Sequence, residues 1–383
     1  DMLSGRLLSA RLRAFRRECG KASGRKGKVY QAATGLIRAL EHGGCRENSA
    51  PMVEAAGRLI GALGQEHQPG GGQAARDLIA FLSAWHRAQE EREDFVLLEE
   101  QAGAKSASLT ALNLNPSPYL RQATRGLSGC VYYSATLQPL SAMLEVLGGG
   151  EEDACLALPS PFPEEHLLAL HLPVNTRYQA REGSLLPAAQ AIQALFEARP
   201  GKVIAYFPSF VYLNRVAEKL RELAPGLPLR LQEPGMGEAS RLDFLAAFTG
   251  DGAPVLGLCV LGGVFGEGVD LPGQALIAAA VVGVGLPQVN PERDLYRQRM
   301  QEALGDGFGH AYRNPGMHKV VQAAGRLIRS ASDRGVLLLM DDRYAQRDYA
   351  ALLPPHIRPV RVKSPGEVRA LAQEFWAGSL EGA

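Results

Sequence analysis

The stretch KVIAYFPSFVYLNRVAEKLREL, residues 202–223, decides the fold. It opens with a mostly apolar, partly β-branched run, which is typical of a strand buried on both faces. Pro208 and Ser209 end this run, and the residues after them carry apolar side chains at helical spacing. A buried strand followed directly by an amphipathic helix predicts one unit of a parallel α/β fold.

The same alternation of strands and helices continues from about residue 128 to the end of the sequence. The predicted strands are Cys130–Ser134, Leu167–Leu172, Lys202–Phe207, Val255–Val260, Leu276–Val282 and Gly335–Met340. The predicted helices are Leu185–Ala198, Phe210–Leu223, Glu238–Phe248, Glu292–Leu304, Pro315–Ile328 and Pro365–Trp376. Residues 1–105 show little that is typical of strands and read as helical over 7–19, 29–42, 53–65 and 74–100.

Composition places the chain among globular proteins and excludes several classes of function. Its 383 residues are 46% hydrophobic and suggest two or three domains. Because 41 Lys and Arg nearly balance 40 Asp and Glu, any nucleic-acid binding must come from local patches. No apolar run reaches the ~18 residues of a membrane span, so we expect no membrane partner.

The cysteines give no sign of a metal centre. The five of them are far apart and form no C-x-x-C pair, which excludes a zinc ribbon or a self-contained iron–sulfur ligand set. We therefore expect no metal site in this chain. Such cysteines fit a reducing compartment, and we expect a cytoplasmic protein. The cysteines are Cys19, Cys45, Cys130, Cys155 and Cys259.

Hydroxyl side chains stand at the ends of two predicted strands. Ser134 and Thr136 follow the first strand, at the edge where α/β folds place their ligands. Ser209 begins a predicted helix, where a hydroxyl and backbone N–H groups can hold a phosphate. Taken one at a time, these hydroxyls are more often ordinary helix caps.

A glycine-rich loop, GGVFGEGVDL, covers residues 262–271 after the strand that ends at Val260. Its glycines allow close backbone approach, and Glu267 and Asp270 offer carboxylates to a hydroxyl or a cation. The loop does not fit the dinucleotide fingerprint G-x-G-x-x-G, and the chain contains no Walker A pattern G-x-x-x-x-G-K-[ST]. A plain glycine-rich loop remains an alternative.

The run QAAGRLIR, residues 322–329, places two arginines beside a glycine. On the predicted helix Pro315–Ile328, Arg326 and Arg329 are three residues apart and therefore neighbours on one face. Two such guanidiniums can reach a transferring phosphoryl group from across a cleft. The alternative is a surface arginine pair.

These segments, taken in order, resemble motifs III to VI of the XPD/DinG-like superfamily 2 DNA helicases, in particular the bacterial DinG-like branch. The matching segments are SATL at 134–137, FPS at 207–209, GEGVD at 266–270 and QAAGRLIR at 322–329. The resemblance spans residues 106–362. It implies a helical Arch-like domain, the last segment of a first RecA-like domain and a second RecA-like domain, over 1–105, 106–150 and 151–383 respectively.

The resemblance also implies a role for each motif residue. Charge on the γ-phosphate of ATP would be stabilised by Arg326 and Arg329 and sensed by Gln322. Glu267, Gly268 and Asp270 would couple the nucleotide state to DNA binding. Ser134 and Thr136 would relay the closure of the two domains. Phosphates of single-stranded DNA would be held by Ser209, Gly262 and Gly263. Gly266 departs from the family, in which Ser or Trp is usual at that position.

The family's Walker A and D-E-A-H motifs lie upstream of motif III and do not occur in this sequence. The resemblance therefore implies the carboxyl-terminal half of a helicase that moves 5′ to 3′ on single-stranded DNA. ATP and Mg²⁺ would be shared with an amino-terminal half, and the family's iron–sulfur domain would also lie there. The start at Asp1 agrees with a segment of a longer protein. We expect this chain alone to be inactive.

Other classes of function remain as alternatives. A degenerate, non-catalytic module would bind DNA or a partner without ATP hydrolysis, but such a module has no need of Arg326 and Arg329. A small-molecule α/β enzyme is disfavoured by the absent dinucleotide fingerprint and by the lack of a His/Cys/Ser constellation. His310 and His318 stand alone in the sequence and favour structural or surface positions.

Overall fold

The computed structural model describes residues 5–8, 12–13, 15–17, 28–42, 50–63, 80–81, 84, 93–101, 107–249, 253–266 and 276–378. The chain divides into two compact units. The first draws on Asp1–Cys130, Glu145–Glu151 and Asn290–Gly307, and the second on Val131–Leu144, Glu152–Val289 and Phe308–Ala383. The boundaries implied by the resemblance, after residues 105 and 150, remain predictions.

A seven-stranded parallel sheet organises the second unit, in the order β10-β4-β9-β8-β5-β7-β6. Its strands are β4 Leu167–Leu172, β5 Lys202–Phe207, β6 Leu229–Leu231, β7 Val255–Val260, β8 Ala278–Val282, β9 Gly335–Met340 and β10 Val360–Arg361. The predicted bounds of β4, β5, β7 and β9 are confirmed, and β8 begins two residues later than predicted, at Ala278 rather than Leu276. The edge strands β6 and β10 are too short to show a periodicity in the sequence.

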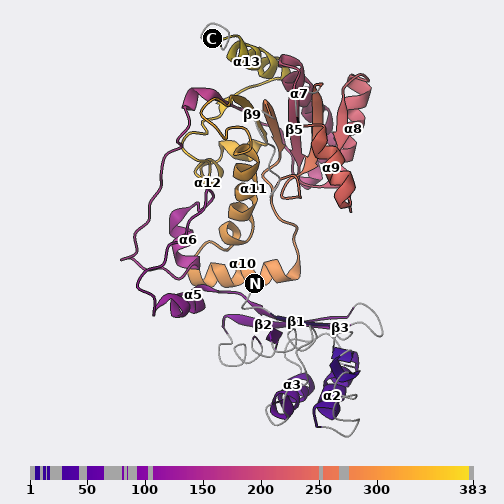
Figure 1. Ribbon diagram of the computed structural model, residues 1–383, viewed down its shortest axis with the longest axis vertical. Coiled ribbons are helices and arrows are strands. Elements are labelled where there is room, and N and C mark those ends of the chain that lie inside the picture. Colours follow the sequence, from indigo (N-terminus) through magenta and orange to yellow (C-terminus); the bar gives the residue numbers. More distant parts are fainter. Residues whose placement is uncertain are drawn as a thin grey trace. The chain divides into compact units, whose positions relative to one another are not determined.

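Helices cover both faces of this sheet (Figure 1). One face packs against α7 Arg181–Ala198, α8 Phe210–Leu223 and α13 Pro365–Ala377. The other packs against α9 Glu238–Ala246, α11 Asn314–Ala324 and α12 Arg347–Ala350. Shorter elements are α6 Leu140–Val146, η1 Glu164–His166, η2 Tyr178–Ala180, η3 Gly309–Arg313 and η4 Asp342–Ala345.

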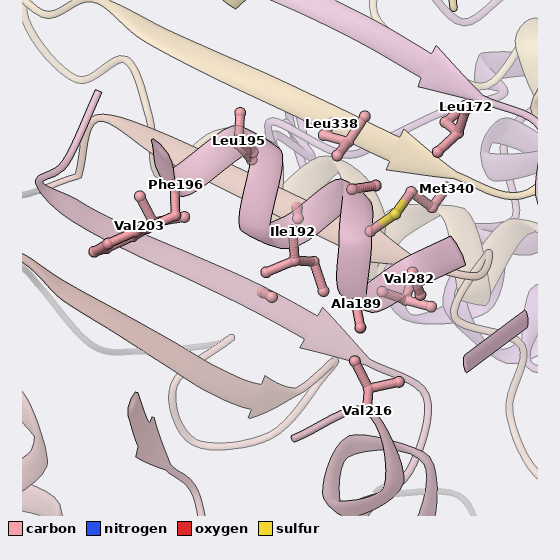
Figure 2. Close-up of a cluster of buried hydrophobic side chains, with 14 of the residues drawn as sticks. Leu172, Ala189, Ile192, Leu195, Phe196, Val203, Val216, Val282, Leu338 and Met340 are labelled. Carbon is pink, nitrogen blue, oxygen red and sulfur yellow. The ribbon is translucent and has the colours of Figure 1, made fainter. Parts of the chain in front are cut away.

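Alternate side chains of the central strands enter two separate cores. In β5, Val203 and Phe207 lie in the core under α7, whereas Ile204 and Tyr206 lie in the core under α11. Figure 2 shows Val203 with Ile192 of α7 and with side chains of β8 and β9 in the first of these cores. Burying such a side chain contributes about 1.5–3 kcal/mol, which explains why these strands are apolar throughout.

The first unit contains a three-stranded antiparallel sheet in the order β1-β3-β2. Its strands are β1 Gly5–Leu8, β2 Phe95–Gln101 and β3 Ala107–Asn113, and its helices are α2 Lys28–His42, α3 Ala50–Leu63, α5 Ser117–Thr124 and α10 Pro291–Leu304. The prediction that residues 1–105 hold little strand is wrong for β1 and β2. Both strands pair with β3, and neither shows the alternation of apolar and polar residues that would have predicted a strand.

Helix α10 joins this first unit although it lies far along the chain. Arg299 on α10 donates to Asp94 at 2.8 Å, just before β2. Both side chains are largely buried, at 18% and 14% exposed. The pair therefore fixes α10 against the start of β2 more firmly than a surface ion pair would.

The predicted strand Cys130–Ser134 does not form. These residues have no regular secondary structure, and Val131 and Tyr133 are 82% and 89% exposed. A strand is stable only beside a neighbour that accepts its backbone hydrogen bonds. Neither sheet of the described residues supplies such a neighbour to this segment.

In the part of the chain that the structure describes, no helix is long and apolar enough to cross a membrane.

We expect Gly285→Ala to destabilise the second unit by roughly 2 kcal/mol or more, because it strains the backbone and creates a clash. Gly285 has φ +64°, and an added Cβ would lie 2.7 Å from the carbonyl oxygen of Gly316. Gly226→Ala is the control, since no atom lies within 4 Å of its added Cβ. Urea unfolding should separate the two variants, and equal midpoints would contradict the close approach.

Candidate functional site

The carboxyl ends of β5 and β7 bring Ser209 and Gly262 to one edge of the sheet. Phe207 pairs with Val260, so Ser209 and Gly262 each lie two residues beyond this last pair of the two strands. The Leu261 N–H donates to the Phe207 carbonyl at 2.8 Å and extends the pairing past the strands. The Ser209 hydroxyl accepts the Tyr212 N–H at 3.3 Å, so Ser209 caps α8 as an ordinary N-cap would.

The glycine loop after β7 turns tightly over a buried glutamine. Gly262 has φ +72°, Gly263 donates to Val260 at 3.1 Å, and Gly266 donates to Gly263 at 2.8 Å. The Gln232 side chain is buried and accepts the Val260 N–H at 2.8 Å. A Cβ on Gly263 would meet the Gln232 amide at 3.2 Å. Position 263 therefore needs glycine, because a side chain there would be crowded against Gln232. This agrees with the close backbone approach that the sequence predicts for the loop.

Helix α11 and the turn that follows it contact this loop at two points. A Cβ on Gly262 would lie 2.8 Å from Cδ of Lys319, so the lysine stem lies against the start of the loop. Seven residues further along the chain, Arg326 donates through Nη2 to the Gly266 carbonyl at 3.1 Å. The structure thus adds Lys319 to the residues that sequence reasoning identified.

The two arginines of the predicted finger pair do not share a helix face. Helix α11 ends at Ala324, four residues earlier than predicted, and Arg326 lies in the following turn. Asp333 is buried and its Oδ2 accepts the backbone N–H groups of Arg329 and Ser330, each at 2.8 Å. This carboxylate stabilises a non-helical backbone after Gly325, a residue with low helix propensity. Gln322 is exposed in the last turn of α11.

Arg326 and Arg329 nevertheless act on a common neighbour, the hydroxyl of Tyr206. Tyr206 is fully buried and donates to the Phe265 carbonyl at 3.3 Å. Burial, followed by the Cys259 thiol, raises the pKa of Tyr206, while the charges of Arg326 and Arg329 oppose that rise. Both guanidiniums therefore lie within electrostatic range of one group. Tyr206, Phe207 and Phe265 are all buried in the core.

The segment with Ser134 and Thr136 is connected to α11. The two hydroxyl oxygens lie 3.2 Å apart, and the Thr136 N–H donates to Ser134 at 3.2 Å in a local turn. Two residues later, the Gln138 carbonyl oxygen lies 2.6 Å from Nε2 of His318 on α11. His318 therefore has a structural role, in agreement with the prediction from the sequence.

A buried ionic cluster occupies the carboxyl ends of β4 and β9, and sequence reasoning assigned no role to it. Asp341 is fully buried and accepts hydrogen bonds from Arg343, at 2.7 Å to Nε and 2.8 Å to Nη2, and from the Thr176 hydroxyl. His171 lies 2.8 Å from the Asp341 carbonyl oxygen. Burial alone would raise the pKa of Asp341, but its hydrogen bonds and the Arg343 charge outweigh burial and lower it. The signal in the sequence that could have revealed this cluster is the presence of Asp341 and Arg343 just after β9, a wholly apolar strand.

Some predicted site residues cannot be placed. Glu267, Gly268 and Asp270 lie outside the described residues. Within the described ranges, no group of three or more His, Cys, Asp or Glu side chains is arranged to hold a metal ion.

The comparisons with known proteins agree with this architecture. Residues 192–360 match the family model described as "Helicase C-terminal domain". The chain is 32% identical over 214 residues to the ATP-dependent DNA helicase YoaA of Escherichia coli (strain K12), covering 54% of this chain and 32% of the relative. It is 29% identical over 252 residues to the ATP-dependent DNA helicase DinG of Photobacterium profundum, covering 61% and 34%.

Solved structures show the same RecA-like fold. The structure of S. tokodaii Xpd4 matches with a TM-score of 0.60 at 15% identity, covering 94% of this chain and 72% of that chain. The chain spans about a third of the length of the curated relatives it matches.

Proposed function

We propose that this chain is a member of the XPD/DinG-like superfamily 2 helicases and supplies the arginine-bearing half of an ATP-dependent DNA motor. The match of residues 192–360 to the helicase C-terminal domain model and the similarity to YoaA and DinG support this proposal. The observation that carries this proposal is the contact of α11 and the turn after it with two points of the glycine loop. Lys319 lies at Gly262, and Arg326 holds Gly266. A shift of α11 together with this turn would therefore move both points of the loop.

The nucleotide-facing role belongs to Arg326, Arg329 and Gln322. ATP, when bound, supplies the γ-phosphate whose charge two guanidiniums can stabilise. Asp333 fixes the backbone of Arg329, and Arg326 is positioned by Gly266. Because the sequence contains neither a Walker A loop nor a D-E-A-H motif, we assign Mg²⁺ and the phosphate-binding lysine to an amino-terminal half. An iron–sulfur cluster, if present, would also belong there.

Single-stranded DNA is proposed to lie on the edge formed by Ser209, Gly262 and Gly263. The first turn of α8 has backbone N–H groups without helical acceptors, and such groups suit a phosphate. Lys319 brings a cation to the same place. Contacts of this kind bind the backbone without reading the base sequence.

Coupling between the two ligands is proposed to run through the loop that begins at Gly262. Glu267, Gly268 and Asp270 follow Gly266 directly in the chain, so the proposal assigns them to the coupling of nucleotide state to DNA. Ser134 and Thr136 are proposed to relay domain closure, because their segment is bonded to α11 through His318. Movement 5′ to 3′ and a cytoplasmic location complete the proposal.

The chain is expected to bind single-stranded DNA weakly and with strong salt dependence, because the proposed contacts are to phosphates. Each neutralised phosphate adds about −0.7 to the slope of log K against log salt for a single strand. Fluorescence anisotropy with oligothymidine between 50 and 200 mM salt, roughly the range over which such contacts weaken, measures this slope. Binding that does not change with salt would exclude a phosphate groove.

The chain alone is expected to hydrolyse no ATP, since its sequence contains neither the Walker A loop nor the D-E-A-H motif that supply the phosphate cradle and the magnesium ligands. A steady-state phosphate-release assay with single-stranded DNA checks this. Turnover at rates of about 1 s⁻¹ or more, in the usual range of enzymes, would overturn the division of the site between two halves.

A further inference from the structure

An exposed tyrosine and a half-buried arginine lie where β4 leads into α7. Tyr178 in η2 is 83% exposed, and Arg181 is the first residue of α7. The guanidinium carbon of Arg181 lies 5.2 Å from the ring centroid of Tyr178 and 5.2 Å from that of Tyr212. Both distances are within the range of cation–π contacts. We refer to Tyr178, Arg181 and Tyr212 as the arginine–tyrosine cluster.

The charge of Arg181 is not neutralised by the protein. Among the described residues no carboxylate pairs with it, and its Nε is buried without a hydrogen-bond partner. The neighbouring arginines do have a counter-charge, since Arg177 pairs with Asp342 and Arg215 pairs with Glu182. Burial is the main cause that lowers the pKa of Arg181, with a smaller contribution from Arg343, and the two tyrosines oppose it. A partly desolvated cation without a counter-charge favours an anionic ligand.

The cluster lies on the same sheet edge as Ser209. Tyr212 donates its backbone N–H to Ser209 at 3.3 Å, and its phenol oxygen lies 2.5 Å from the Ser184 hydroxyl. A Cβ on Gly283 would contact Thr176 at 3.3 Å and Pro208 at 3.8 Å. The segment before Tyr178 therefore runs beside the turn that leads to Ser209.

The buried ionic cluster fixes the backbone that carries Tyr178. The Thr176 hydroxyl donates to Asp341, and the Asp342 N–H donates to the Val174 carbonyl at 3.1 Å. Arg177 adds an ion pair with Asp342 at 2.6 Å. A side chain presented on a backbone held in this way loses little freedom on binding, which favours affinity.

We propose that the arginine–tyrosine cluster is a subsite for one nucleotide of single-stranded DNA, with the base stacked on Tyr178 and the phosphate bonded to Arg181. The subsite rests on the proposed function, because it extends the DNA path beyond Ser209. An exposed aromatic ring over a guanidinium suits any base, since every base has a π-face, so the subsite has no sequence preference.

Tyr178→Ala tests the stacking part of the subsite. We expect affinity for oligothymidine to fall about tenfold, the order of effect of losing one stacked base, with the salt slope unchanged. Tyr178→Phe keeps the ring and should stay within about twofold of the unaltered chain. Because the Tyr178 side chain is exposed, neither substitution disturbs the core.

Arg181→Gln tests the phosphate part. We expect weaker binding and a loss of about 0.7 from the salt slope, equal to one phosphate contact. Arg369→Gln is the matched control, because Arg369 lies on α13 and already pairs at 3.1 Å with Glu197, at the other end of α7 from Arg181. That variant should keep the slope and affinity of the unaltered chain.

The outcomes separate the subsite from the proposed function. If the unaltered chain binds oligothymidine, and Tyr178→Ala and Arg181→Gln both bind as it does, the subsite is excluded while the DNA path at Ser209 stands. Equal losses in Tyr178→Ala and Tyr178→Phe would also exclude stacking. If the unaltered chain does not bind DNA at all, the proposed function itself fails.

Discussion

Arg329→Lys, made in the proposed parent helicase, is expected to lower DNA-stimulated ATP hydrolysis by at least about 10²-fold. Arginines that act on a transferring phosphoryl group contribute about 10³–10⁵ in rate, and lysine keeps the charge but loses the planar fork that grips two oxygens. Asp333 accepts the backbone N–H of Arg329, a contact that the substitution keeps. Phosphate release under saturating ATP measures the effect.

DNA affinity without nucleotide should barely change in the same variant. Arg230→Lys is the control, because Arg230 lies on the edge strand β6 and forms only a loose ion pair with Asp243 at 3.7 Å. If Arg329→Lys lost DNA binding and kept its ATP turnover, Arg329 would belong to the DNA path and the role proposed for it would be wrong.

Asp341→Ala is expected to destabilise the second unit by about 3–5 kcal/mol, since it leaves the Arg343 charge largely buried and unpaired. Arg343 is 13% exposed and Asp341 is fully buried. Asp342→Ala removes the neighbouring carboxylate, whose pair with Arg177 is 42% and 39% exposed, and should cost less than about 1 kcal/mol. Thermal unfolding of both variants checks this, and equal midpoints would contradict the role of the cluster.

The contribution of the Asp341 charge also has a defined pH dependence. Its folded pKa is lowered, so the charge stabilises the fold at pH values above the unfolded pKa of about 3.9. This part of the stability is lost as the pH falls through the folded pKa. The gap in stability between the unaltered chain and Asp341→Ala should therefore be constant near neutral pH and narrow below about pH 4.

The fold of the second unit could be predicted because its central strands are buried on both faces. In β5 and β9 this produces unbroken apolar runs, and their predicted bounds are confirmed. The predicted strand at 130–134 is similar in sequence to these, but no described strand pairs with it. β2 is a strand because it pairs with β3, and the sequence of β2 alone does not predict this pairing.

The candidate site could be predicted by motif but not by geometry. The prediction that Arg326 and Arg329 share a helix face is wrong, because α11 ends at Ala324 and Asp333, a residue outside the motif, accepts the Arg329 N–H in the non-helical segment that follows. Lys319 and Gln232 come from segments far from the glycine loop in the chain, and only folding places them against it. The Asp341 cluster combines residues after β4 and β9 for the same reason.

Hydrogen exchange of the chain with and without oligothymidine tests the central claim most directly, namely that DNA lies on the edge formed by the ends of β5 and β7. Protection is expected in residues 208–212 and 261–266, the two segments assigned to the proposed path, and none is expected in α13, which covers the far end of α7. Protection confined to α13, or no protection under conditions in which the oligonucleotide is bound, would contradict the claim.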